Sequence, residues 1–288
     1  MKKLLIVLLA GLWIFVACAP SQPATSAAPN VETVVAETMQ ALTSAAPPPT
    51  SAPSGIAVSY GNVSFVIPNG LALGAAGESV AAVIGEEGAP WEVAPAHIRF
   101  SFTGYNDALA KFSVMQISIF PAQDYEAARG NSLPRLQAIL AAPAAPLDPK
   151  SMPLVPFFNA TAMMTAQATR LGFNGGSGVR MVTQYGQAVM PIANSGTFYH
   201  FEGLTSDGRY YLVAILPIGA PFLANGFDVP SAPPPDGIPF PDMNSTDPNV
   251  FEAYFRAVEA KLNAADPNVF SPALPLLDAL IQSITVAP

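Results

Sequence analysis

Residues 198–218 read FYHFEGLTSDGRYYLVAILPI, and this segment sets the fold class. Asp207-Gly208 lies between two aromatic-rich apolar runs, which predicts a β-hairpin with a two-residue type I′ turn. In that register the numbers of opposed residues sum to 415, so Tyr199 is expected opposite Leu216. The second run is apolar at successive positions. A strand that is apolar on both faces is expected at the centre of a sheet.

The sequence on either side of this hairpin indicates further antiparallel strands. Residues 160–218 have the pattern of a meander, with turn signals at Asn174-Gly175-Gly176-Ser177-Gly178 and at Asn194-Ser195-Gly196. Three more strands are expected upstream, the later two because apolar and polar residues alternate in them with period two. These strands cover residues 58–67, 97–103 and 114–120.

Three segments have the 3.6-residue periodicity of helices. Residues 123–142 predict one helix with Pro134 in its first turn, where proline is tolerated. Two closing helices are expected to begin at Asp247-Pro248 and Ser271-Pro272, each an N-cap followed by proline. The apolar faces of the three helices hold Leu133, Leu136 and Leu140; Phe251, Phe255, Val258 and Leu262; and Leu277, Leu280, Ile281 and Ile284.

These elements predict an α+β fold, an antiparallel sheet packed by helices in a single domain over residues 55–288. The opening strand ends in Pro68-Asn69-Gly70-Leu71, an aromatic hairpin comes late, and the last helix ends in Gln282-Ser283-Ile284. In these features the chain resembles the PsbP-like α/β/α sandwich. Its central part is similar to uncharacterised lipoproteins of the bacterial envelope, a resemblance that implies no activity.

The N-terminal residues have the three zones of an export signal. Lys2 and Lys3 precede thirteen apolar residues, 4–16, too few to span a bilayer as a helix. Phe15-Val16-Ala17-Cys18 then resembles the lipobox of bacterial lipoproteins, although Leu is commoner than Phe at its first position. The resemblance implies removal of signal peptide 1–17 and lipidation of Cys18, the single cysteine of the chain. An ordinary secretory signal is the alternative.

The resemblance places the mature protein on the extracytoplasmic face of a cell membrane or outer envelope, attached through its N-terminal lipid. Residues 18–54 begin with the lipidated Cys18 and continue as a linker of mostly Ala, Pro, Ser and Thr. Loss of Lys2 and Lys3 leaves ten basic and twenty acidic residues, a net charge of −10. This negative charge makes a nucleic-acid partner unexpected. It would also repel anionic lipid headgroups, so the acyl chains are expected to anchor the protein.

Few residues offer catalytic or metal chemistry. No Gly-x-Ser-x-Gly, dinucleotide or phosphate-loop motif is present, and no cofactor or metal is predicted. The candidate polar site is His200 and Glu202, which point to the same face of the predicted hairpin and could orient a base. A metal would need a third ligand, such as His97 on a neighbouring strand. The alternative is a structural pair on a partly wet face.

Residues 219–246 contain seven prolines and join the predicted central strand to a closing helix. So long a connection is typical of a binding loop, or it covers the sheet edge as a rigid lid. The sequence therefore favours a non-catalytic module that binds an envelope protein or a small ligand. Two alternatives stay open: a solute-binding lipoprotein of a transporter, and a secreted hydrolase with an unfamiliar site.

Overall fold

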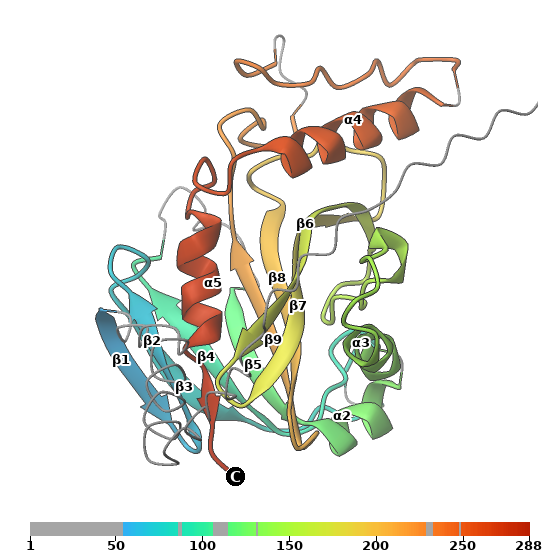
Figure 1. Ribbon diagram of the computed structural model, residues 1–288. Coiled ribbons are helices and arrows are strands. Elements are labelled where there is room, and N and C mark those ends of the chain that lie inside the picture. Colours follow the sequence, from blue (N-terminus) through green and yellow to red (C-terminus); the bar gives the residue numbers. More distant parts are fainter. Residues whose placement is uncertain (1–53, 86–87, 106–114, 131, 229–232, 248) are drawn as a thin grey trace, which may run out of the picture. The chain divides into compact units, whose positions relative to one another are not determined.

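The computed structural model describes residues 54–288, except 86–87, 106–114, 131, 229–232 and 248 (Figure 1). Residues 1–53, which hold Cys18 and the predicted linker, lie outside the described residues. The described chain is an α+β fold with two antiparallel sheets and helices packed against them, as predicted. None of its described helices is both long and apolar enough to cross a membrane.

The larger sheet has seven strands in the order β3-β4-β5-β9-β8-β7-β6. The four strands from β6 to β9 are the predicted meander, and β9 lies at the centre as expected. β3 was not predicted, since its Gly- and Ala-rich sequence has little β propensity. The strands are β3 (Gly74–Val80), β4 (His97–Thr103), β5 (Gln116–Pro121), β6 (Thr161–Phe173), β7 (Gly176–Gly186), β8 (Thr197–Thr205) and β9 (Tyr210–Pro217).

The smaller sheet corrects the prediction of one opening strand over residues 58–67. The chain instead forms a hairpin of β1 (Gly55–Tyr60) and β2 (Val63–Pro68), with Gly61 at φ 59° in the turn. Because glycine has no Cβ, Gly61 reverses the chain where the apolar pattern alone suggests continuation. The third strand of this sheet is β10 (Thr285–Val286), which pairs with β2.

Helices cover both faces of the large sheet. α2 (Ala122–Arg129) and α3 (Ser132–Ala141) replace the single helix predicted over residues 123–142. They are separate because Gly130 adopts φ 59° and its N–H donates to the Glu126 carbonyl at 2.9 Å, which ends α2. A short 3₁₀ turn, η2 (Pro149–Ser151), follows α3.

The closing helices, α4 (Val250–Ala264) and α5 (Leu274–Gln282), each begin two residues later than predicted. Before α4 the Asp247 carboxylate accepts the Asn249 N–H at 2.9 Å, so Asp247 ends a turn and Asn249 is the N-cap. Before α5 the N-cap is Ala273, and the proline of the first turn is Pro275 rather than Pro272.

The large sheet has an apolar core on each face. The first core lies between this sheet, the small sheet, α4 and α5, and includes Phe65, Phe100 and Leu277. The second core lies between the opposite face, α2 and α3, and includes Phe120, Tyr125 and Leu136. Both faces of β8 and β9 are therefore buried, which is why these two strands carry almost unbroken apolar sequence.

The β8–β9 hairpin has the predicted register, since Tyr199 lies opposite Leu216. Gly208 has the expected positive φ, 70°, but a type I′ turn requires the residue before it to have one as well. Among the described non-glycine residues, those at positive φ are Phe157, Gln167 and Asp236, so Asp207 does not meet this condition. The turn is instead closed by the Gly208 N–H donating to the Thr205 carbonyl at 2.8 Å.

Candidate functional site

His200 and Glu202, the predicted polar pair, lie together inside the second core. Their side chains are 1% and 0% exposed, and His200 Nε2 is 2.7 Å from Glu202 Oε1. The other carboxylate oxygen, Oε2, accepts the Tyr211 hydroxyl at 2.7 Å. His200 Nδ1 lies 3.0 Å from the Ala214 carbonyl. The face that was expected to be partly wet is therefore dry, because α2 and α3 cover it.

The arrangement fixes how many protons this network holds. The Ala214 carbonyl and the Glu202 carboxylate are both acceptors, and they flank the two ring nitrogens of His200. The two contacts therefore need two hydrogens, one on Nδ1 and one shared between Nε2 and Oε1. The pair is then neutral overall, either as imidazolium with carboxylate or as imidazole with carboxylic acid. A neutral, fully bonded network is what a buried position favours.

Within the described part of the chain, neither a nucleophile nor a third metal ligand lies beside this network. Ser118 shares its face of the sheet, but β9 lies between Ser118 and Glu202, which separates the two strands by about 10 Å. His97 lies on β4, three strands from β8, a distance of about 14 Å. Among the described residues no three His, Cys, Asp or Glu side chains could hold a metal ion together.

The proline-rich segment, residues 219–246, forms a second kind of site. Its first part is held to the loop before β8: the Asn194 N–H donates to the Ala224 carbonyl at 2.8 Å, and the Asn194 side chain accepts the Ala220 N–H at 2.8 Å. Gly219 pairs with Ser271 through two backbone hydrogen bonds of 2.9 Å. These hydrogen bonds hold the first part of the segment against the rest of the domain.

The later part of the segment returns over α4. The Phe240 ring lies edge-on to Tyr254, with centroids 5.0 Å apart, and 5.8 Å from Phe251. At the other end of α4 the Lys261 amine sits 5.0 Å from the centroid of the Phe222 ring, a cation–π contact. Two aromatic residues of the segment thus hold it to α4 at two points.

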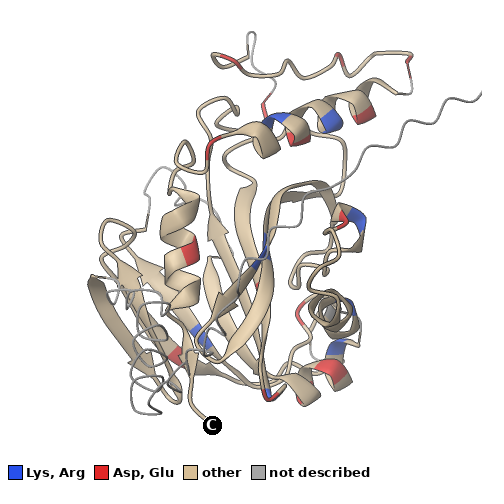
Figure 2. Ribbon diagram, in the orientation of Figure 1, with Lys and Arg blue, Asp and Glu red and all other residues tan. Residues whose placement is uncertain are grey.

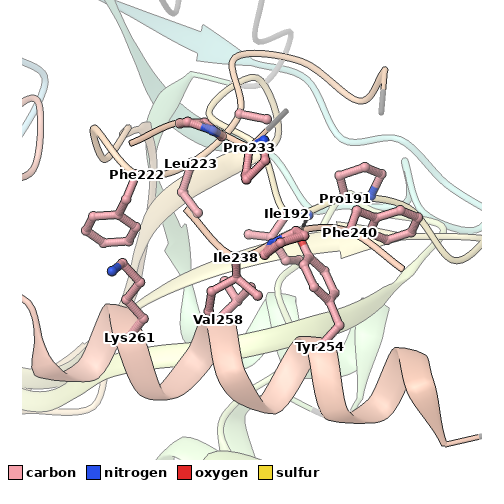
Figure 3. A pocket seen from close by; sticks show the side chains of 13 residues that line it. Pro191, Ile192, Phe222, Leu223, Pro233, Ile238, Phe240, Tyr254, Val258 and Lys261 are labelled. Carbon is pink, nitrogen blue, oxygen red and sulfur yellow. Dashed lines mark hydrogen bonds between the residues drawn. The ribbon is translucent and has the colours of Figure 1, made fainter. Parts of the chain in front are cut away.

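Between these two points lies a cavity of about 180 Å³, named here the α4 cavity (Figure 3). Its walls come from three places in the sequence: the loop before β8, the proline-rich segment and α4. They are mainly prolines, aromatic rings and aliphatic side chains. The lining residues are Pro191, Ile192, Phe222, Leu223, Ala224, Pro233, Pro234, Ile238, Pro239, Phe240, Tyr254, Val258 and Lys261.

Tyr254 supplies a polar group to this wall. Its hydroxyl accepts the Ile192 N–H at 3.0 Å. Burial raises the pKa of Tyr254, and the hydrogen bond from Ile192 opposes that rise only in part. The phenol is therefore protonated at neutral pH and keeps one hydrogen to donate.

Comparison of this chain with protein-family models, with curated proteins and with solved structures gave no match. The site must therefore be argued from its own residues. Sequence reasoning singled out the proline-rich segment but missed Tyr254 and Lys261 as site residues. The spacing of Tyr254, Val258 and Lys261 could have identified them from the sequence, because it places all three on one side of α4.

Proposed function

We propose that this protein is a non-catalytic binding module, anchored by a lipid on Cys18 to the extracytoplasmic face of a bacterial membrane, and that the α4 cavity is its ligand site. The lipobox-like Phe15-Val16-Ala17-Cys18 supports the anchor, and the Ala- and Pro-rich linker that follows would hold the domain clear of the membrane. The ligand of this proposal is a small molecule with an apolar group that fills the cavity.

The α4 cavity is the observation that carries the proposal. A dry apolar cavity of about 150 Å³ is large enough to bind benzene. At about 180 Å³ the α4 cavity can hold a group of that size or slightly larger. Its walls are built by a long proline-stiffened connection, and stiff walls lower the entropy lost when a ligand binds.

Burial of His200 and Glu202 argues against the hydrolase alternative. A general base has to reach its substrate, and this pair is enclosed between the large sheet, α2 and α3. Its hydrogen-bonding capacity is also used within the protein by Ala214 and Tyr211. The pair therefore fits a structural role better than a catalytic one.

The charge distribution favours a small ligand over nucleic acid. Figure 2 shows basic and acidic residues alternating along α4, where Glu252, Arg256, Glu259 and Lys261 follow one another. The mature chain would carry a net charge of −10. Such a surface repels a phosphate backbone instead of releasing its counterions.

The test is saturable binding of fluorobenzene to the full chain in phosphatidylcholine nanodiscs, followed by ¹⁹F NMR, with empty nanodiscs correcting for partition into lipid. Ala224→Leu places a larger side chain on the cavity wall and should abolish the saturable component. Ala257→Leu, on the exposed side of α4, is the matched control and should bind like the wild type.

Thermal melts of both variants separate loss of the cavity from loss of the fold. Absence of saturable binding in the wild-type protein would refute the proposal. Equal binding by the wild type and by a folded Ala224→Leu variant would refute the assignment of the site.

A further inference from the structure

We infer that the α4 cavity accepts a single-ring aromatic carboxylate, with the ring inside the cavity and the carboxylate on the Lys261 amine. The inference rests on the proposed binding function and names the chemical class of its ligand. It follows from three properties of the cavity: its size, the shape of its walls and the sign of its one charge.

The size of the cavity limits the apolar part of the ligand to one ring. A cavity of about 150 Å³ holds benzene, and the α4 cavity measures about 180 Å³. A fused two-ring system or a long acyl chain would need a considerably larger space. A benzene ring with one short substituent fits.

The walls of the cavity suit a flat ring. Phe240 and Tyr254 are already edge-on to each other, and rings prefer such edge-to-face or offset contacts. Pro233, Pro234 and Pro239 add rigid apolar surface from the proline-rich segment. Rigid walls favour a rigid ligand, since little conformational entropy is then lost by either partner.

The charge of the cavity comes from Lys261. Among the described residues that line the cavity, Lys261 is the only charged one. Its amine rests against the face of the Phe222 ring, which stabilises the cation without using any of its three hydrogens. In the part of the chain that the structure describes, Lys261 has no carboxylate partner. A ligand carboxylate would supply that partner.

Two acidic residues share a second groove with Lys261. Phe222 and Lys261 also line an outer groove of about 450 Å³, which includes Asp236 and Asp266. The Asp266 carboxylate accepts both the backbone N–H and the side-chain amide of Asn268, at 2.8 and 2.9 Å, so it is engaged in its own turn. The acids thus belong to the outer groove, and the α4 cavity itself presents a positive charge.

The two polar groups of the cavity stand at opposite ends (Figure 3). Lys261 lies beneath Phe222 at one end, and Tyr254 lies beside Phe240 and Ile192 at the other, with Ile238 and Val258 between them. A carboxylate at Lys261 therefore directs the ring toward Tyr254. The Tyr254 hydrogen could then be donated to an acceptor on the far side of the ring.

The experiment compares three ligands of similar size on the full chain in phosphatidylcholine nanodiscs, again by ¹⁹F NMR: 4-fluorophenylacetate, 4-fluorophenylacetamide and 4-fluorophenethylamine. We expect the anion to bind roughly two- to fivefold more tightly than the neutral amide, the effect of one half-exposed ion pair. The amine should bind more weakly than the amide. Lys261→Met, which keeps the apolar stem, should bring the anion-to-amide ratio close to one.

Two controls identify the charge responsible. Lys261→Arg keeps a cation at the cavity and should retain the preference for the anion. Arg256→Met removes one positive charge from the exposed side of the same helix and should leave the preference unchanged.

The outcomes separate this inference from the proposed function. Equal affinity of the wild type for anion and amide would overturn the ligand class while leaving the binding function standing. An anion preference that survives in Lys261→Met would overturn the role of Lys261. If fluorobenzene and all three ligands fail to bind, the binding function itself is wrong and this inference falls with it.

Discussion

Glu202 is a carboxylate in the middle of an apolar core, and its neighbours make that position possible. His200 and Tyr211 bind its two oxygens at 2.7 Å each. Both partners are themselves buried, and removal of Glu202 would take one hydrogen bond from each of them. A buried polar group without a partner is costly, which makes the network an all-or-none unit.

We predict that Glu202→Ala lowers the free energy of unfolding by about 3–5 kcal/mol, the range observed when one member of a buried charge pair is removed. Urea unfolding followed by circular dichroism measures the change. Glu202→Gln keeps an acceptor for Tyr211 and should lose less. Glu252→Ala, on the exposed side of α4, is the control and should change stability little. Unchanged stability of Glu202→Ala, with loss of an enzymatic activity, would contradict a structural role.

At the scale of elements, α5 is fixed to the large sheet by one ion-pair network. Asp278 on α5 has Oδ1 3.2 Å from the Arg180 Nε of β7, and the same oxygen accepts the Tyr199 hydroxyl of β8 at 2.9 Å. The Arg180 guanidinium also donates to the Gln167 carbonyl of β6. One carboxylate thus links a helix to two strands, and its partner Arg180 extends the link to a third.

This network makes stability depend on pH. Burial raises the pKa of Asp278 above its ordinary value of 3.8, while Arg180 and Tyr199 lower it and only partly offset the effect of burial. The folded state therefore holds this proton to higher pH than the unfolded state does. The stability that Asp278 contributes is fully present below pH 3.8 and is lost as the pH rises through the raised folded pKa.

We predict that Asp278→Asn gains stability relative to the wild type as the pH rises from 3.8 through that range. The ion pair with Arg180 forms only when Asp278 is ionised, and it is one of the causes that oppose the rise of the pKa, so it does not reverse this trend. Urea unfolding of both proteins at a series of pH values gives the difference. If the free energy of unfolding of Asp278→Asn minus that of the wild type stays constant or falls with rising pH, the raised pKa of Asp278 is contradicted.

The boundaries of elements were the part of the fold that the sequence predicted least well. Gly61 and Gly130 interrupt apolar patterns that continue on either side of them. The string DPNVF occurs twice, at Asp247 and at Asp266, and each copy forms a turn in which the aspartate accepts a backbone N–H, from Asn249 and from Asn268. Neither aspartate is a helix N-cap, since α4 and α5 begin after Asn249 and Ala273.

For the molecule as a whole, the large sheet buries both of its faces, and the α4 cavity adjoins the first core. Ile192, Leu223, Tyr254 and Val258 belong to that core and also line the cavity. The negative charge of the mature chain opposes contact with anionic headgroups, so attachment to a membrane has to come from the proposed lipid.

We predict that Cys18→Ser abolishes labelling of the protein by a radioactive fatty acid and leaves the signal peptide uncleaved by the lipoprotein peptidase. Ser21→Ala, three residues further on, is the control and should be labelled and cleaved normally. Labelling and a change in electrophoretic mobility measure the two effects. Normal labelling of Cys18→Ser would show that Cys18 is not the lipidation site.

Local sequence patterns were enough to predict the α+β class, the order of the meander, the register of the β8–β9 hairpin and the apolar faces of α3 and α5. Each of these depends on interactions between residues that are close in sequence. Alternation with period two and a glycine between two strands are enough to fix a hairpin, and spacing at three and four residues is enough to define a helix face.

The segments that cover each face could be identified only from the folded chain. Periodicity placed His200 and Glu202 on one side of a strand, but α2 and α3 made that side dry. In the same way, the seven prolines indicated a stiff connection, and only its return over α4 brought Phe222 to Lys261 and closed a cavity. The physical reason is that burial depends on contacts between distant segments, and local sequence specifies where a side chain points without specifying what it meets.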